Sequence, residues 1–228
     1  TLKAITFDVF GTLLDWEGGL EPAVKDVLKE AGSQASSNAF LANWRNRQLE
    51  FSMMNTLVER RHEKFTSITR RALVSTCRAM KVRLTKDAEA KLTGAWFSLP
   101  PFPDARHALS RLKTQFKLAP LSNGDRAMLA KALKVARFNF DAIIAADMIG
   151  AYKPSPKVYL TAAEILKLPP SSILHASGNQ FDVYGAKLAG LKVAWVNRRA
   201  AALEEWGIQP DLEVNSLTHL ADKLLPEP

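Results

Sequence analysis

The stretch "FDVFGTLLDW", residues 7–16, decides how this chain is organised. An apolar run leads into Asp8, as in a buried strand, and Gly11 and Thr12 then break the strand pattern. Helical patterns follow until about Leu99. The first strand, roughly residues 2–8, must therefore find its neighbours further along the chain.

Four amphipathic segments make up the helical block. Their apolar residues recur at helical spacing, and four consecutive helices predict a bundle. The stretch "PPFP", residues 100–103, forms a stiff boundary after them. The predicted helices are "LEPAVKDVLKEAG" (20–32), "NAFLANWRNRQLEFSMMNTL" (38–57), "HEKFTSITRRALVSTCRAMKV" (62–82) and "DAEAKLTGAWFSL" (87–99).

Short apolar runs alternate with helical patterns beyond residue 103. They are "FKLAPLS" (116–122), "AIIAAD" (142–147), "ILHAS" (173–177) and "VAWVN" (193–197). Continuous apolar strands separated by helices are typical of a buried parallel sheet. We therefore predict an α/β protein with a Rossmann-like parallel sheet core, residues 1–15 and 100–228, and an inserted helical cap, a four-helix bundle, over residues 16–99.

Composition sets the broad class of the protein. Among 228 residues, 47% are hydrophobic and 24% charged, as in ordinary globular proteins. The single cysteine, Cys77, cannot form an internal disulfide, and we find neither a signal-peptide pattern nor an apolar run of about 18 residues. We expect a cytoplasmic protein that does not enter a membrane. The net charge of +8 fits nucleic acid, a membrane surface or small anions as partners.

Polar side chains gather where the predicted strands end. Ligands of open parallel sheets bind at the carboxyl ends of the strands, so these side chains should share one cleft. Together they supply a carboxylate, hydroxyls, amides and an ammonium group. They are Asp8 after the first strand, Ser122 and Asn123 after the second, Lys153 after the third, and Ser177, Asn179 and Asp182 after the fourth.

This combination suits a nucleophilic carboxylate that acts on a small anion. Asp8 can form a covalent ester, Lys153 offsets negative charge, and backbone amides near Phe10, Gly11 and the helix after Gly124 can hold oxygens. Each feature also has a structural alternative. Asp8 fits a turn or cap, residues 122–125 fit a turn followed by an N-cap, and Lys153 fits a surface lysine.

Arg45 adds a positive charge from the second predicted helix. Helical spacing places it on the same face as Leu41, Leu49 and Ser52, where a buried cation needs a partner or an anion. The alternative is that it reaches the edge of the bundle or pairs with Glu50 or Glu59.

These motifs together resemble the haloacid dehalogenase-like superfamily, and within it the L-2-haloacid dehalogenases (type II). "FDVFGTLLD" looks like the nucleophile loop, and "LSNG", "KPSPKVY" and "SGNQFD" look like the second, third and fourth motifs of the family. "WRNRQLEF" is similar to the cap helix that supplies the family's active-site arginine. The match covers the whole chain in order.

The resemblance implies a role for each site residue. Asp8 would be the nucleophile, Thr12 would orient its loop, and Lys153 would hold Asp8 ionised and aimed. The substrate carboxylate would bind Ser122 and the backbone amides of the first loop, at Val9, Phe10 and Gly11. Arg45, Asn123 and the ring of Phe181 would form the halide cradle. Tyr159, Ser177, Asn179 and Asp182 would complete the polar network, with Asp182 as the candidate that orients or activates the hydrolytic water.

The resemblance also explains the aromatic residue after Asp8. Most members of the superfamily are magnesium-dependent phosphatases with a second aspartate where Phe10 stands, because an alkoxide leaving group needs a proton. Halide needs none, and Ser177 stands where phosphatases hold a metal-binding aspartate, so we expect no cofactor and no metal ion. Relatives usually carry Tyr at Phe10 and commonly Trp at Phe181, which affects the expected substrate range. Phe10 also fits a packing role.

The predicted function is that of an (S)-2-haloacid dehalogenase whose partner is a small anionic haloacid. One alternative is a magnesium-dependent phosphatase of the same superfamily. Another is a basic nucleic-acid-binding module built on "RRHEK", Arg70, Arg71, Arg78, Lys81 and Arg83, although we expect no nucleic acid because these charges also fit a solvated helix face. Trp206 is a candidate contact in a homodimer, or an ordinary surface or core residue.

Overall fold

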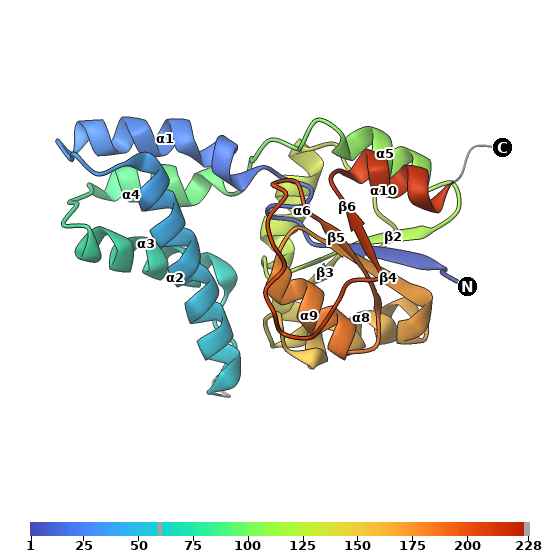
Figure 1. Cartoon of the computed structure of the whole chain (residues 1–228). Helices are drawn as coiled ribbons and strands as arrows, with labels where there is room; N and C mark the ends of the chain where they lie inside the picture. Colours follow the sequence, from blue (N-terminus) through green and yellow to red (C-terminus); the bar gives the residue numbers. More distant parts are fainter. Residues whose placement is uncertain (59–60, 226–228) are drawn as a thin grey trace.

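The computed structural model describes residues 1–58 and 61–225, and it contains a sheet-based core beside a group of helices, the cap (Figure 1). The sheet has six parallel strands in the order β3-β2-β1-β4-β5-β6. The first strand lies between β2 and β4, so the prediction that it joins the later sheet is confirmed. The strands are β1 (Ala4–Phe7), β2 (Lys117–Ser122), β3 (Ile144–Ala145), β4 (Ile173–Ser177), β5 (Lys192–Val196) and β6 (Leu212–Val214).

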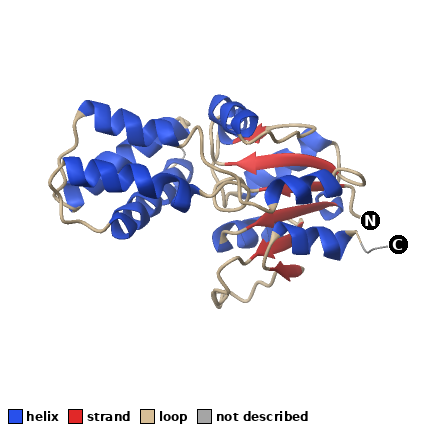
Figure 2. Ribbon diagram, turned by 90° about the horizontal axis from the view of Figure 1, so that it is seen from above, coloured by secondary structure: helices blue, strands red, loops and turns tan. Residues whose placement is uncertain are grey.

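Helices cover both faces of this sheet (Figure 2). One apolar cluster packs α5, α6 and α10 against the sheet and continues into the cap, and a second packs α8 and α9 against the opposite face. The predicted α/β fold with an inserted cap is therefore confirmed. The core helices are α5 (Ala105–Leu112), α6 (Arg126–Val135), α7 (Ala146–Ile149), α8 (Pro156–Leu166), α9 (Gln180–Leu188) and α10 (Leu217–Leu224), with a short 3-10 turn, η1 (Pro170–Ser172).

The cap consists of four helices, α1 (Trp16–Glu30), α2 (Ser37–Leu57), α3 (Phe65–Ala79) and α4 (Lys86–Ala95). Each was predicted, but α3 is shorter than the expected 62–82, because Lys64 is extended at its start and Lys81 adopts a left-handed φ of 56° after its end. None of the helices in the described residues is long and apolar enough to cross a bilayer.

Two strand predictions need correction. The run "AIIAAD" forms only the two-residue strand β3 and then turns into α7, where Asp147 accepts a hydrogen bond from the backbone of Arg126. The sequence pattern also missed β6, which is three residues long. Both lie at the edges of the sheet, where strands are short and lack the continuous apolar run of buried strands.

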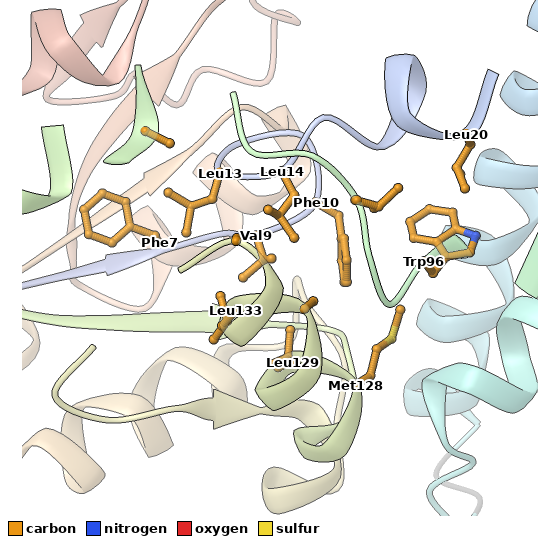
Figure 3. Packing of buried hydrophobic residues seen from close by; sticks show 14 of the residues in the cluster. Phe7, Val9, Phe10, Leu13, Leu14, Leu20, Trp96, Met128, Leu129 and Leu133 are labelled. Carbon is orange, nitrogen blue, oxygen red and sulfur yellow. The ribbon is translucent and has the colours of Figure 1, made fainter. Parts of the chain in front are cut away.

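The cap and the core meet around the first loop. The ring of Phe10 extends from the core loop towards Trp96 of the cap (Figure 3). The chain enters the cap and returns from it at neighbouring points, since the N–H of Asp15 donates to the carbonyl of Pro100 at 2.9 Å. We propose domain boundaries at residues 15/16 and 99/100, and the start of α1 at Trp16 supports the first of them.

Candidate active site

Asp8 follows the last residue of β1 and is 6% exposed. Its carboxylate accepts three hydrogen bonds from three separate segments. Thr12 Oγ1 and Asn179 Nδ2 donate to Oδ2 at 3.0 and 2.8 Å, and Lys153 Nζ donates to Oδ1 at 3.1 Å. Donors from the loops after β1, β3 and β4 thus converge on one buried carboxylate, as the strand-end argument predicts.

Lys153 is 1% exposed, so the alternative of a surface lysine is wrong. Its ammonium group lies between two carboxylates, 3.1 Å from Asp8 and 2.7 Å from Asp182. Its backbone N–H donates to Oδ1 of Asn123 at 2.9 Å, which fixes the loop after β3 against the loop after β2. A buried ammonium requires such anionic partners, because the charged form would otherwise be lost.

Asp182 is fully buried on α9 and accepts hydrogen bonds on both oxygens. Tyr159 donates to Oδ1 at 2.6 Å, and Lys153 to Oδ2. Burial by itself would raise the pKa of Asp182. The charges and hydrogen bonds of His175 and Lys153 lower the pKa by more than burial raises it, so the net pKa lies well below the usual range. Burial, together with Asp182, holds the pKa of Tyr159 well above its usual value. This carboxyl group is therefore ionised and the phenol protonated at neutral pH.

His175 is a member of this network that sequence reasoning missed. It lies within β4 at 0% exposure, with Nε2 2.8 Å from Oδ2 of Asp182 and Nδ1 2.9 Å from Oγ1 of Thr6. The available signal was a histidine inside the apolar run "ILHAS", where a buried polar side chain requires partners.

The first loop has a tight turn with two unpaired amides. Gly11 has φ +95°, and a Cβ there would lie 3.3 Å from Trp16 Nε1. Its N–H donates to the carbonyl of Leu14 at 2.8 Å and is therefore occupied. Within the described residues, the N–H groups of Val9 and Phe10 have no hydrogen-bond acceptor. Of the three amides predicted to bind substrate, only these two remain available for an anion.

Three predicted hydroxyl groups stabilise turns. Thr12 Oγ1 accepts from the N–H of Gly178 at 2.8 Å in addition to donating to Asp8. Ser177 Oγ accepts from the N–H of Asn179, and Ser122 Oγ accepts from the N–H of Gly124, each at 3.1 Å. Ser122 and Ser177 make no hydrogen bond to Asp8 among the described residues.

Arg45 lies on α2 at 7% exposure. Its guanidinium carbon is 5.6 Å from the ring centroid of Trp16 and 5.7 Å from that of Trp96, and Nη1 donates to Gln48. No ion pair with Glu50 is present in the described part of the chain, and Glu59 lies outside it. Burial lowers the pKa of Arg45 to about 10, and the charge of Asp8 opposes this shift, so the side chain remains a cation at neutral pH.

The two aromatic residues of the predicted site differ in their surroundings. Phe10 is 2% exposed, stacks on Phe65 with ring centroids 6.2 Å apart and meets Trp96 edge-on at 5.4 Å. It therefore packs the cap against the core, as its alternative interpretation expected. Phe181 is half-buried on the first turn of α9 and makes no aromatic contact with the described residues.

A cavity of about 610 Å³ opens beside this site, between the cap and the core. Gly11, Trp16 and Asn179 line it, whereas Asp8 does not. Asn179 thus both lines the cavity and donates to the Asp8 carboxylate. Glu17 of α1 and Arg199 of the loop after β5 form an ion pair across the same cavity.

The polar side chains that contact Asp8 are hydrogen-bond donors. Among residues 1–58 and 61–225, no group of three or more His, Cys, Asp or Glu side chains is arranged to hold a metal ion. The position between Asp8 and Asp182 is filled by the ammonium group of Lys153.

Comparisons with known proteins identify the family of this chain. Residues 2–190 match the family model of haloacid dehalogenase-like hydrolases. The chain is 34% identical to an (S)-2-haloacid dehalogenase of Pseudomonas sp. (strain YL), covering 95% of this chain and 91% of that protein. It is 33% identical to haloacetate dehalogenase H-2 of Moraxella sp. (strain B), covering 96% and 97%.

Solved structures give the same result. The L-2-haloacid dehalogenase from Xanthobacter autotrophicus with chloropropionic acid covalently bound superposes with a TM-score of 0.86 at 30% identity, and the match covers 100% of both chains. A dehalogenase crystallised with an intermediate complex gives a TM-score of 0.91 at 32% identity over 100% of this chain and 98% of the other. The chain belongs to the haloacid dehalogenase-like hydrolase family, and its similarity to the (S)-2-haloacid dehalogenases of that family extends over nearly its whole length.

Proposed function

We propose that this protein is an (S)-2-haloacid dehalogenase, a hydrolase acting on carbon-halide bonds that converts short 2-haloalkanoic acids to the inverted 2-hydroxy acid and halide. The observation that supports this most strongly is the buried Asp8 carboxylate, which donors from Thr12, Asn179 and Lys153 hold in one orientation. A fixed, ionised carboxylate next to cations is suited to attack an electrophilic carbon.

In the first step an oxygen of Asp8 displaces the halogen from C2. The new C–O bond forms opposite the C–X bond, whose electron pair leaves with the halide, and the configuration at C2 inverts. The product is an ester between Asp8 and the substrate. No proton is needed by the leaving group, in agreement with the apolar surroundings of Phe10 in place of a general acid.

Two groups of residues bind the substrate in this proposal. The unpaired N–H groups of Val9 and Phe10, with Ser122, bind the substrate carboxylate, and Gly11 shapes the turn that presents them. The departing halide is held by Arg45, Asn123 and the ring of Phe181. The negative charge of Asp8 favours the cationic form of Arg45, which supports this arrangement.

In the second step water attacks the carboxyl carbon of Asp8 in the ester. The bond between this carbon and the ester oxygen breaks, and that oxygen leaves as the hydroxyl group of the 2-hydroxy acid with one proton of the water. The other proton passes to solvent, and the oxygen of the water remains in the Asp8 carboxylate. Asn179 and Lys153 stabilise the negative charge that develops on the Asp8 oxygens, and Tyr159 and Ser177 keep the surrounding loops in place. Because both oxygens of Asp182 already accept hydrogen bonds from strong donors, we favour its role in holding Lys153 over a role in accepting a proton from water.

The cavity beside Asn179 offers a route for substrate and product. It is larger than a three-carbon haloacid needs, and the cation of Arg199 lies on its wall. Opening of the Glu17–Arg199 pair would widen the approach, in the manner of other enzymes whose caps close over the substrate.

Halide release from L-2-chloropropionate in the presence of EDTA tests the proposal. We expect activity in the wild type and none in Asp8→Asn. In H₂¹⁸O, repeated turnover should also place ¹⁸O in the carboxyl group of residue 8, which mass spectrometry of the peptide detects. Product formation with an unlabelled residue 8 would contradict the covalent mechanism.

A magnesium-dependent phosphatase remains the enzymatic alternative to test. Hydrolysis of an aryl phosphate that chelator abolishes, without halide release from any 2-haloacid, would favour it. Magnesium prefers several oxygen ligands, whereas Phe10 and Ser177 provide no carboxylate beside Asp8.

The nucleic-acid alternative has less support. Arg70 and Arg71 lie 3.4 and 2.9 Å from Glu89 and Glu63, respectively, in ion pairs at the cap surface. Arg78, Lys81 and Arg83 are exposed, and Arg60 of "RRHEK" lies outside the described residues. Salt-dependent binding to DNA or RNA would revive this alternative.

The remaining expectations concern location and assembly. A cytoplasmic location and a homodimer stay part of the proposal. Trp206 is 72% exposed while one face of its indole stacks on Tyr184 at 5.5 Å, which leaves the other face available for a second copy. Analytical ultracentrifugation of the wild type and Trp206→Ser tests the dimer.

A further inference from the structure

Asp125 begins α6 but does not cap it. It occupies the N-cap position of that helix and makes no side-chain hydrogen bond to it, so the N-cap predicted for residues 122–125 is wrong in this respect. Instead, Oδ1 accepts from the backbone N–H of Phe65 at 2.8 Å and Oδ2 from that of Thr66 at 2.9 Å. These are the first two residues of α3, so a core carboxylate caps a cap helix.

This helix has no capping side chain of its own. Lys64 occupies its N-cap position and makes no capping hydrogen bond. A carboxylate at a helix N-terminus satisfies free N–H groups and favours the helix dipole, and here both acceptor oxygens are used at 4% exposure. Since the donors belong to the cap and the acceptor to the core, both hydrogen bonds exist only while the cap is seated on the core.

An unbroken series of hydrogen bonds leads from Asp125 to Arg45. The carbonyl of Phe65 accepts from Thr69 Oγ1 at 2.8 Å, and the same hydroxyl accepts from Gln48 Nε2 at 2.7 Å. Gln48 Oε1 then accepts from Arg45 Nη1. Gln48 and Thr69 are 0 and 2% exposed, so water does not compete for these hydrogen bonds.

We propose that Asp125 is a positioning residue, which fixes the start of α3 against the core and, through Thr69 and Gln48, sets the place of the Arg45 guanidinium. Asn123, two residues before it, is assigned to the halide cradle, so one turn of the core would supply a halide contact and also position the cap's cation. The inference rests on the proposed function, in which Arg45 stabilises the departing halide.

Kinetics of Asp125→Asn test this inference. The amide keeps the shape of the side chain but carries no charge. Only its oxygen can accept, so one of the two hydrogen bonds from Phe65 and Thr66 is lost. We expect kcat/KM for L-2-chloropropionate to fall about tenfold, as loss of a charge-assisted hydrogen bond predicts. The matched control is Asp141→Asn, which removes a carboxylate that accepts the N–H of Leu118 at 2.8 Å within the core. It should keep the wild-type kcat/KM.

Two readouts separate positioning from a general structural effect. Chloride is a poorer leaving group than bromide, so a misplaced Arg45 should lower kcat more for the chloro acid, and the bromo/chloro ratio of kcat should rise in Asp125→Asn only. Thr69→Val removes the hydroxyl that links Phe65 to Gln48 in the same series. In double variants, its effect on kcat/KM should be non-additive with that of Asp125→Asn and additive with that of Asp141→Asn. The proposal would be overturned if Asp125→Asn lowered kcat equally for the chloro and the bromo acid and if Thr69→Val were additive with both Asp125→Asn and Asp141→Asn.

Amide hydrogen exchange provides a readout that does not need activity. In Asp125→Asn, exchange should accelerate in peptides covering residues 45–48 and 65–69 and remain unchanged in peptides from α1 and α4. Unchanged exchange at residues 45–48 would overturn the inference even if the wild type proves inactive on haloacids. A wild type without halide release but with this exchange pattern would refute the proposed function alone. If Asp125→Asn fails to fold, Thr69→Val alone gives the same kinetic and exchange comparisons.

Discussion

The imidazole of His175 and the carboxylate of Asp182 are packed together at 0% exposure, with Nε2 2.8 Å from Oδ2. Thr6 satisfies the other ring nitrogen. Replacing His175 by Leu leaves a buried hydroxyl and a carboxylate oxygen short of a partner. We expect the free energy of unfolding to fall by about 1–3 kcal/mol, measured by urea denaturation at pH 7.

His107 provides the control for this change because it is exposed. His107→Leu should change the free energy of unfolding by less than about 0.5 kcal/mol. His175→Gln, which retains a donor, should lose less stability than His175→Leu. Equal stability of wild type and His175→Leu would show that the two hydrogen bonds contribute nothing net.

Lys153 is the only described ammonium within 4 Å of Asp8 and Asp182. Lys153→Met leaves two buried carboxylates without their shared cation, so we expect a loss of about 3–5 kcal/mol in stability and halide release below detection. Lys157, an exposed lysine on α8, serves as the control. A Lys153→Met variant that stays folded and releases halide at the rate of Lys157→Met would contradict the assignment.

Asp182 should contribute to the pH dependence of stability. Its pKa in the folded protein lies well below the usual value, which is about 3.9 in an unfolded chain. A depressed pKa gives stability that is fully present above the unfolded value and is lost as pH falls towards the folded one. The stability difference between wild type and Asp182→Asn should therefore be constant from about pH 5 to 7 and shrink below about pH 4.

Urea denaturation of both proteins across this range measures the effect. Glu30→Gln, a change at an exposed carboxylate of α1 that makes no hydrogen bond or ion pair with the described residues, gives the baseline acid response of the chain. A difference that grows on acidification would mean that the pKa of Asp182 is raised in the folded protein, with burial outweighing Lys153 and His175.

The sequence was sufficient to predict what depends on local pattern. Apolar runs located the central strands, helical spacing located the cap helices, and the strand-end rule brought Asp8, Lys153 and Asp182 together. These predictions held because buried parallel strands and amphipathic helices have periodicities that read directly from residue types. Roles such as the halide cradle came only from the family resemblance.

Long-range pairings escaped prediction because either partner alone looks ordinary. Asp125 after "SNG" is typical of an N-cap, and only the packed structure puts the start of α3 against it. His175 in a strand and Gln48 on a helix likewise acquire meaning from partners distant in sequence. Gly11 is a different case, because its N–H donates to the carbonyl of Leu14 within its own turn and is therefore not available to a substrate.

Gly185 allows α9 to pack closely against the site. A Cβ at this position would lie 2.7 Å from Tyr159 Oη and 2.8 Å from the carbonyl oxygen of Pro154, both nearer than Cβ contacts allow. Gly185→Ala should therefore displace the phenol that donates to Asp182 and the loop that carries Lys153. We expect kcat for halide release to fall at least about tenfold, with a loss of about 1–3 kcal/mol in stability from overpacking.

Gly94→Ala is the matched control, because Gly94 also lies within a helix, α4, and a Cβ there would have no atom within 4 Å. This change should raise stability by about 0.5–1 kcal/mol, since alanine favours a helix over glycine, and leave kcat unchanged. If both variants kept the wild-type kcat, small shifts of Tyr159 and the Lys153 loop would not affect catalysis. The requirement for a tightly fixed Asp8–Lys153–Asp182 geometry would then be wrong.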